Sequence, residues 1–156
     1  MLRILDTNVV SEPLAARPSA GVLAGIKAHS AELAISAISW QEMYFGLERL
    51  PPGARRDRIR AYLEKRVRPT LPILPFDAAA GEWQARERAR LSRIGRTPPY
   101  ADTQIAAIAA VNGLILVTRD AGDFSEFSGL AVENWFDQSG EARPGGRGSG
   151  RRRSPA

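Results

Sequence analysis

The sequence predicts an α/β protein with a central parallel sheet, and this fold class rests on two patterns. Five short apolar runs have the length and composition of β-strands: Leu2–Leu5, Leu33–Ser36, Leu71–Leu74, Leu114–Thr118 and Leu130–Trp135. Longer segments between them have the spacing of helices: Ser19–His29, Trp40–Leu50, Ala54–Val67, Ala78–Ile94 and Tyr100–Asn112. Continuous apolar strands that alternate with helices are typical of a parallel sheet covered on both faces.

Turn residues and changes of pattern separate these elements along the chain. The first run is apolar apart from one arginine and ends at Asp6, and the second, LAIS, leads into the helical segment AISWQEMYFGLERL. The PPG of residues 51–53 separates two helical segments, and the PP of residues 98–99 precedes a very apolar helix. The fourth run, LILVT, ends in RDAGDF. We find no internal repeat and no domain linker among these turns.

The composition suits one globular domain and excludes several kinds of site. The chain has 156 residues, of which 44% are hydrophobic and 25% charged, which is ordinary for a single domain with its own core. It has no cysteine and one histidine, so disulfides, thiolate metal sites, a cysteine nucleophile and a histidine-cluster metal site are excluded. A divalent metal would need oxygen ligands. Without an apolar run of membrane-span length or an export-like leader, we expect no membrane contact and a cytoplasmic location.

Much of the net charge of +5 comes from the C-terminal end of the chain. Residues 137–156 contain five arginines and two acids, a charge of +3, so residues 1–136 carry +2. This end is rich in Arg, Gly, Ser and Pro, a composition typical of disorder. We therefore expect one folded domain over residues 1–136 and a disordered tail over 137–156. The tail is most simply a solubilising end, although a basic arm also attracts nucleic acid.

Acidic residues follow the predicted strands at the edge where parallel sheets bind their ligands. Asp6 directly follows the first run, and Glu42 lies in the segment after the second. Asp120 and Asp123 follow the fourth run, and Asp102 opens the apolar helix in PPYADTQIAAIAAVNG. Because ligands bind beyond the carboxyl ends of such strands, we expect several of these acids to converge at one end of the sheet.

Each acid also has a simpler structural explanation. Asp6 could cap the helix that follows it, and Ser39 with Glu42 fits a capping box, the better explanation for Glu42 taken alone. Asp102 would complement a helix dipole, and Asp120 could belong to an ordinary turn. However, no lysine closely follows any of these acids as a partner, and clustered carboxylates repel one another. A bound Mg²⁺ or Mn²⁺ would relieve that repulsion and activate water for hydrolysis.

Four segments, in order and with compatible spacing, match one known pattern. They are ILDTNVVSEP with Asp6, SAISWQEMYFGL with Glu42, PPYADTQIAAIA with Asp102 and LILVTRDAGDF with Asp120. Together they resemble the PIN-domain ribonucleases, and within them the VapC toxins of the FitB-like group. The resemblance covers residues 1–136. It implies a three-layer α/β/α sandwich with a central parallel sheet, and Mg²⁺- or Mn²⁺-dependent hydrolysis of RNA by metal-activated water.

The resemblance also implies roles for individual acids. Asp6 and Asp102 would be the main metal ligands, and Asp120 would complete the metal site directly or through water. Glu42 would bind a second metal or orient a water, so the catalytic group would comprise all four. Many relatives carry Asn where Asp120 stands and an acid where Asp123 stands, whereas this chain has Asp at both. We choose Asp120 because it directly follows the strand, and expect Asp123 to be structural.

The family further implies an RNA substrate, a homodimer and a small cognate antitoxin that blocks the site. Operator DNA would be contacted only indirectly, through the antitoxin. Four apolar residues of the second helical segment form a wide apolar surface that suits either a partner or the core: Trp40, Tyr44, Phe45 and Leu47. We expect about half of this surface to be core.

Neighbouring residues complete the expected site and exclude other α/β families. Asn8 and Thr118 would fix the acids, and Arg93 and Arg96 would hold phosphates beside them. An aspartate-nucleophile phosphatase needs a second acid where Asn8 stands, a receiver domain needs paired acids and a late lysine, and a Rossmann cofactor site needs a glycine-rich turn. The remaining alternative is a catalytically silent PIN-like module that binds a protein or nucleic acid.

Overall fold

The structure is a computed structural model that describes residues 1–136. It contains a five-stranded sheet, in the order β3-β2-β1-β4-β5, in which every neighbouring pair is parallel. The strands are β1 Arg3–Leu5, β2 Leu33–Ser36, β3 Ile73–Leu74, β4 Ile115–Val117 and β5 Val132–Glu133. All five predicted strands are confirmed in position, and only β2 has the predicted length. The tail predicted over residues 137–156 lies outside the described residues.

Helices of very different length connect the strands. They are α1 Thr7–Val10, α2 Ala20–Ala28, α3 Ala37–Glu48, α4 Ala54–Tyr62, α5 Ala78–Arg93, α6 Tyr100–Val111 and α7 Ala121–Phe124. The predicted helices correspond to α2 through α6, and α4 continues as a π-helical turn, Leu63–Val67. A helix of one turn shows no apolar periodicity, so α1 and α7 were not predicted. Within residues 1–136, no helix is both long and apolar enough to cross a membrane.

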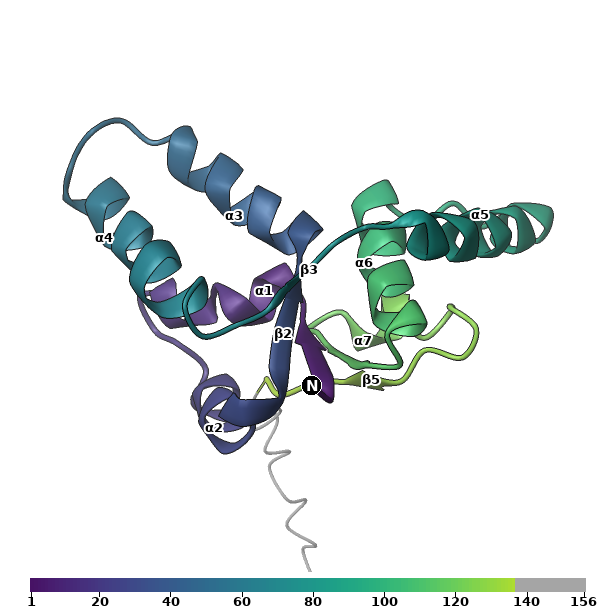
Figure 1. The fold of residues 1–156 in the computed structure, drawn as a ribbon, viewed down its shortest axis with the longest axis horizontal. Helices are drawn as coiled ribbons and strands as arrows, with labels where there is room; N and C mark the ends of the chain where they lie inside the picture. Colours follow the sequence, from purple (N-terminus) through teal and green to yellow (C-terminus); the bar gives the residue numbers. More distant parts are fainter. Residues whose placement is uncertain (137–156) are drawn as a thin grey trace, which may run out of the picture.

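The helices cover the sheet in two layers, each with its own apolar core. Successive strand residues point to opposite faces of a sheet, and Ile4 packs with α5, α6 and α7 whereas Leu5 packs with α1 through α4. The same alternation puts Leu116 in the first cluster and Val117 in the second. Figure 1 shows α3 and α4 on one side of the sheet and α5 and α6 on the other. The predicted three-layer α/β/α sandwich is therefore confirmed.

The strand order reverses direction between β1 and β4, where open parallel sheets generally bind their ligands. The chain leaves the central strand β1 toward β2 and β3, and later returns to the other side of β1 for β4 and β5. At such a reversal the connections diverge, which leaves a crevice beyond the carboxyl ends of the two strands. The register pairs Leu5 with Val117, the last residues of β1 and β4. The next residues, Asp6 and Thr118, thus lie side by side at the crevice.

The segment after β5 returns to α2 and packs on a glycine. The Trp135 ring stacks on His29 with ring centroids 5.4 Å apart. A Cβ atom on Gly25 would lie 2.4 Å from the Trp135 ring. In contrast, a Cβ atom on Gly46, in the last turn of α3, would meet nothing within 4 Å. The absence of a side chain is therefore a packing requirement at Gly25 but not at Gly46.

We predict that alanine has opposite effects at these two glycines. Gly25→Ala should lower the free energy of unfolding, because overpacking costs about 1–3 kcal/mol and exceeds the helix-propensity gain of up to about 1 kcal/mol. Gly46→Ala should raise it by about 0.5–1 kcal/mol. Urea unfolding of both variants beside wild type measures the difference. Stabilisation by Gly25→Ala would contradict the packing of Trp135 on α2.

Candidate functional site

Asp6 lies at the end of β1 and is both a helix cap and the most buried acid of the site. Its Oδ1 accepts a hydrogen bond from the Thr7 backbone N–H at 2.7 Å, which caps α1. Its Oδ2 accepts from the Thr118 hydroxyl at 2.8 Å, and the side chain is only 6% exposed. Burial raises the pKa of Asp6, the bonds from Thr118 and Thr7 lower it, and the nearby Asp120 charge raises it. The cap explanation and the site explanation for Asp6 are therefore compatible.

Asn8 joins the acids that follow β1 and β4. Its Nδ2 donates to Asp6 Oδ2 at 3.3 Å and to Asp120 Oδ2 at 3.2 Å. Its Oδ1 accepts from the Arg119 backbone N–H at 3.2 Å, which fixes the orientation of the amide. The Thr118 hydroxyl also accepts from the Asp120 backbone N–H at 3.0 Å. Asn8 and Thr118 thus position both carboxylates, as their expected supporting role requires.

Asp102 opens α6 and faces the other acids. Burial raises its pKa to about 6, and the charges of four further acids raise it as well: Asp6, Asp120, Glu42 and Asp123. A helix N-terminus favours the charged carboxylate, so burial and repulsion together outweigh that effect here. The structure therefore brings Asp102 into electrostatic contact with each of the other acids named from the sequence. We call Asp6, Glu42, Asp102 and Asp120 the acidic site.

Glu42 reaches the acidic site from α3, and the capping-box interpretation of this residue is wrong. The cap of α3 is Ser36, whose Oγ accepts from the Ser39 backbone N–H at 2.9 Å. Ser39 is thus the third residue of the helix, and Glu42 lies too far into it to reach the cap. Burial raises the pKa of Glu42, a hydrogen bond from Thr7 lowers it, and the Asp6 charge raises it. Glu42 is therefore a half-buried acid beside Asp6.

Asp123 lies at the edge of this group and has fewer contacts than Asp120. Both side chains are exposed, but only Asp120 is held by Asn8. Asp123 contributes to the raised pKa of Asp102. The Asp123 backbone N–H donates to the Asp120 carbonyl at 3.0 Å, which is part of the short helix α7. The geometry favours Asp120 as the fourth member of the acidic site.

The chemistry of these side chains fits a hard cation. All the candidate ligands are carboxylates, and burial together with the charges of the other acids raises the pKa of Asp102. A bound divalent cation would relieve the repulsion between the acids. Within the described residues, no group of three or more His, Asp or Glu side chains is arranged to hold a metal ion. Mg²⁺ commonly binds through one or two carboxylates and keeps several waters. Direct ligation by a pair such as Asp6 and Asp120, which share Asn8, fits that mode.

The arginines near the site divide into paired and unpaired residues. Arg119 extends away from Asp120, with its guanidinium 3.5 Å from Glu12 and 4.0 Å from the centre of the Phe136 ring. Arg96 forms an ion pair with Glu126, so half of the expected phosphate-binding pair is already occupied. Arg93 is exposed, and within residues 1–136 no acid pairs with it. Its expected contact with phosphate therefore stays a prediction.

The apolar surface expected after Glu42 is mostly part of the core. Leu47 is completely buried, and Trp40 and Tyr44 are partly buried against the cluster that includes Leu5. Phe45 is 56% exposed. More of this surface belongs to the core than the expected half, and among these four residues only Phe45 is left in solvent.

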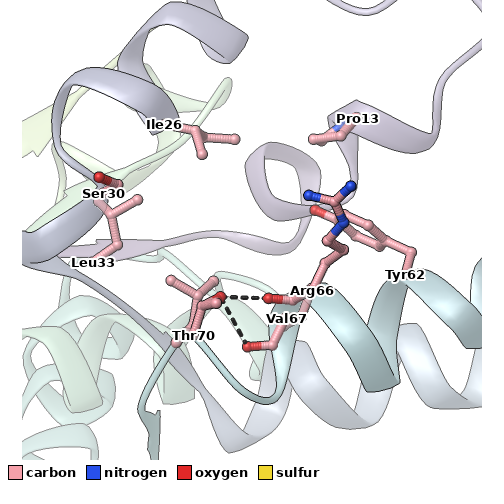
Figure 2. Close-up of a pocket in the computed structure, with 9 residues that line it drawn as sticks. Pro13, Ile26, Ser30, Leu33, Tyr62, Arg66, Val67 and Thr70 are labelled. Carbon is pink, nitrogen blue, oxygen red and sulfur yellow. Dashed lines mark hydrogen bonds between the residues drawn. The ribbon is translucent and has the colours of Figure 1, made fainter.

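A separate pocket has none of the acids in its lining. It has a volume of about 490 Å³ and lies between α2 and the π-helical turn after α4. Figure 2 shows Ile26 and Ser30 on one side of it and Arg66 and Tyr62 on the other. The Tyr62 hydroxyl donates to the Val10 carbonyl at 2.5 Å, and burial raises the pKa of Tyr62 to about 12. No acid lines the pocket, so it is no part of the acidic site.

We predict that Thr118→Val destabilises the fold most when Asp6 is charged. The change preserves shape but removes the hydroxyl that donates to Asp6, and a hydrogen bond to a charged group contributes about 1.5–3 kcal/mol. Thermal unfolding in EDTA should show a loss at pH 7.5 that shrinks as the pH falls and Asp6 is protonated in both proteins. A loss independent of pH would contradict the assignment of this bond to the carboxylate.

We predict that Asp102→Asn stabilises the metal-free protein near neutral pH. The pKa of Asp102 is about 6 in the folded chain against an ordinary 3.8, so stability is lost as the pH rises through this range. The shift sets an upper limit of about 3 kcal/mol, and because the side chain is half exposed we expect about 1 kcal/mol. Unfolding in EDTA should show this gain at pH 7.5 and none at pH 3.5. If Asp102→Asn and wild type were equally stable at both pH values, the crowding of the acids would be contradicted.

Comparison with known proteins identifies the family. The family model of the PIN domain matches residues 3–130 of this chain. The chain is 41% identical over 134 residues to the VapC ribonuclease Y4jK of Sinorhizobium fredii, covering 84% of this chain and 95% of the relative. It is 33% identical over 137 residues to toxin FitB of Neisseria gonorrhoeae, covering 86% of this chain and 99% of the relative. The resemblance inferred from the four acidic segments is therefore confirmed.

Solved structures show the same fold. A structure of FitAB bound to an IR36 DNA fragment contains a chain with a TM-score of 0.80 and 32% identity, covering 90% of this chain and 100% of that one. A member of the VapBC family of toxin-antitoxin systems, VapBC-5 of Mycobacterium tuberculosis, has a TM-score of 0.64 and 27% identity, covering 87% and 98%. From its sequence, its fold and these likenesses, the chain belongs to the PIN domain family.

Proposed function

We propose that this protein is a metal-dependent endoribonuclease toxin of the VapC type. The observation that carries the proposal is the hydrogen bonding of Asn8 to both Asp6 and Asp120, which brings together carboxylates from distant segments of the chain. Burial and the charges of acids from three other segments also raise the pKa of Asp102. A group of carboxylates at a strand-order reversal has no structural benefit large enough to offset its repulsion, but it suits a hydrolytic metal site. The relatives named VapC ribonuclease and toxin FitB support the same activity.

The residues of the acidic site would have different roles in hydrolysis. Asp6 and Asp120, positioned by Asn8, would hold Mg²⁺ or Mn²⁺ together with Asp102. When bound, the metal would supply positive charge to the phosphate oxygens and make water more acidic. Glu42, whose pKa is raised by burial, would orient a water or accept its proton, or bind a second metal.

An antitoxin and a second copy of the chain are the proposed protein partners. Structural relatives described as FitAB bound to DNA and as a VapBC toxin-antitoxin system support a cognate antitoxin. The antitoxin would cover the acidic site and would itself contact operator DNA, so this chain would meet that DNA only indirectly. We propose a homodimer that acts on RNA in the cytoplasm.

We predict that Asp6→Asn and Asp102→Asn each abolish cleavage while leaving the protein folded. Loss of residues that merely support a metal site costs about 10–100-fold in activity, so loss of a ligand should cost more than about 100-fold. Total cellular RNA, incubated with antitoxin-free protein and Mg²⁺ or Mn²⁺, should be cut by wild type and by the control Asp57→Asn, which changes an exposed acid on α4. EDTA should stop the reaction.

Binding of Mn²⁺ gives a second, independent readout. Calorimetric titration should show binding to wild type and to Asp57→Asn, and at least tenfold weaker binding to either acidic-site variant. Equal cleavage by Asp102→Asn and wild type would contradict the assignment of Asp102 to the metal site. Metal binding without any cleavage by folded wild type would instead favour a silent binding module.

A further inference from the structure

Two exposed aromatic rings near the acidic site carry an arginine on one face. Phe45 on α3 is 56% exposed and Tyr100 at the start of α6 is 57% exposed. The Arg49 guanidinium lies 5.0 Å from the centre of the Phe45 ring, and that of Arg88 lies 4.9 Å from the centre of the Tyr100 ring. In each pair the arginine covers part of the ring, and the exposed fraction shows that much of the ring remains open to solvent.

The two aromatic residues lie on α3 and α6, the helices that carry Glu42 and Asp102. Phe45 and Arg49 lie three and seven residues after Glu42, so all three share one face of α3. Ile38, one turn before Glu42 on the same face, packs into the cluster formed with α6, which shows that this face turns toward α6. Tyr100 is the first residue of α6 and lies two residues before Asp102, so the two side chains point to different faces of the helix. The Tyr100 ring lies on the α5 side, against Arg88.

A third arginine–aromatic pair shows what a structural pair looks like in this protein. Arg119 covers Phe136 but also pairs with Glu12 at 3.5 Å, and Phe136 is only half exposed. Within residues 1–136, neither Arg49 nor Arg88 forms an ion pair with an acid. Unpaired guanidinium groups beside open aromatic rings therefore occur next to the acidic site, where an anionic, base-bearing strand would have to pass.

We propose that Phe45 and Tyr100 stack unpaired bases of single-stranded RNA beside the acidic site, with Arg49 and Arg88 attracting its phosphates. Rings that stack on bases, combined with cationic side chains, are the common means of binding single-stranded nucleic acid. Bases inside a duplex are already stacked, so the two rings select unpaired segments. The proposal rests on the proposed function, because it places the strand across the acidic site.

Binding measured without turnover tests this arrangement. The probe is a single-stranded RNA of about ten nucleotides, carrying 2-aminopurine at successive positions, in EDTA, with its integrity checked on a gel. Phe45→Leu and Tyr100→Leu keep apolar bulk but remove the aromatic face. Each should weaken binding about five- to hundredfold and remove the fluorescence quenching of one 2-aminopurine position. Phe45→Trp and Tyr100→Phe should retain both binding and quenching.

A matched charge control lies on the same helix as Arg88. Arg86 is also exposed, but it lies two positions earlier on α5 and lines a different surface with Trp83 and Ser128. Arg88→Ala should weaken binding and reduce the salt dependence of the binding constant by about 0.7 in slope. Arg86→Ala should change both much less. Equal effects of the two variants would show a general charge effect and would overturn the specific role of Arg88.

The outcomes separate this inference from the proposed nuclease activity. Cleavage by wild type together with unchanged binding of the two leucine variants would leave the nuclease standing and overturn the stacking. An equal loss with the same RNA annealed to its complement would also overturn it, because paired bases cannot stack on the rings. If the leucine variants instead change the sedimentation of the chain without RNA and leave RNA binding intact, the rings belong to an interface between copies. No binding of any RNA by wild type would overturn the stacking, whereas metal-dependent cleavage separately decides the nuclease.

Discussion

The buried carboxylate of Asp6 is the group on which the arrangement of the site depends. An acid in this position is costly unless donors surround it, and they come from two neighbouring strands: the Thr7 backbone after β1 and the Thr118 hydroxyl after β4. Asn8 adds a third donor. The pairing of Leu5 with Val117 brings these groups together. Any shift in the register of β1 and β4 would therefore leave Asp6 charged, buried and short of partners.

The remaining acids add an electrostatic cost that the rest of the fold must offset. This cost is clearest at Asp102, whose pKa is raised to about 6 by burial and by its acidic neighbours. Two apolar clusters on the faces of the sheet stabilise the elements that carry the acids. The acids themselves lie at the edge, where the connections diverge and no core is interrupted. Concentrated negative charge on a rigid scaffold is the condition in which a divalent cation gains most from binding.

Positive charge serves two purposes around that centre. Some arginines stabilise loops by pairing with acids. Arg90 pairs with the buried Glu87, which also accepts a hydrogen bond from the Ser128 backbone N–H. Arg96 pairs with Glu126. Others cover exposed rings and form no ion pair within residues 1–136, as Arg88 does on Tyr100. The first group holds the segment after α7 against α5. The second group includes Arg88, which we propose to contact the phosphates of an RNA strand.

The sequence by itself determined the five strands, the five longer helices, the family and the acids of the candidate site, because each depends on a local pattern of apolar runs or short motifs. It was wrong about the cap of α3, and it was incomplete where contacts between distant residues decide the outcome. Ser36 rather than Ser39 caps α3, because β2 ends at Ser36 and the helix begins at once. Arg96, expected to hold phosphates, is instead paired with Glu126. Asn8 was expected to fix the acids, but only the structure shows that it does so by bridging Asp6 and Asp120, the latter across 112 residues. Only the tertiary structure could decide these contacts, since the strand order brings together side chains whose separation along the chain says nothing about their distance in space.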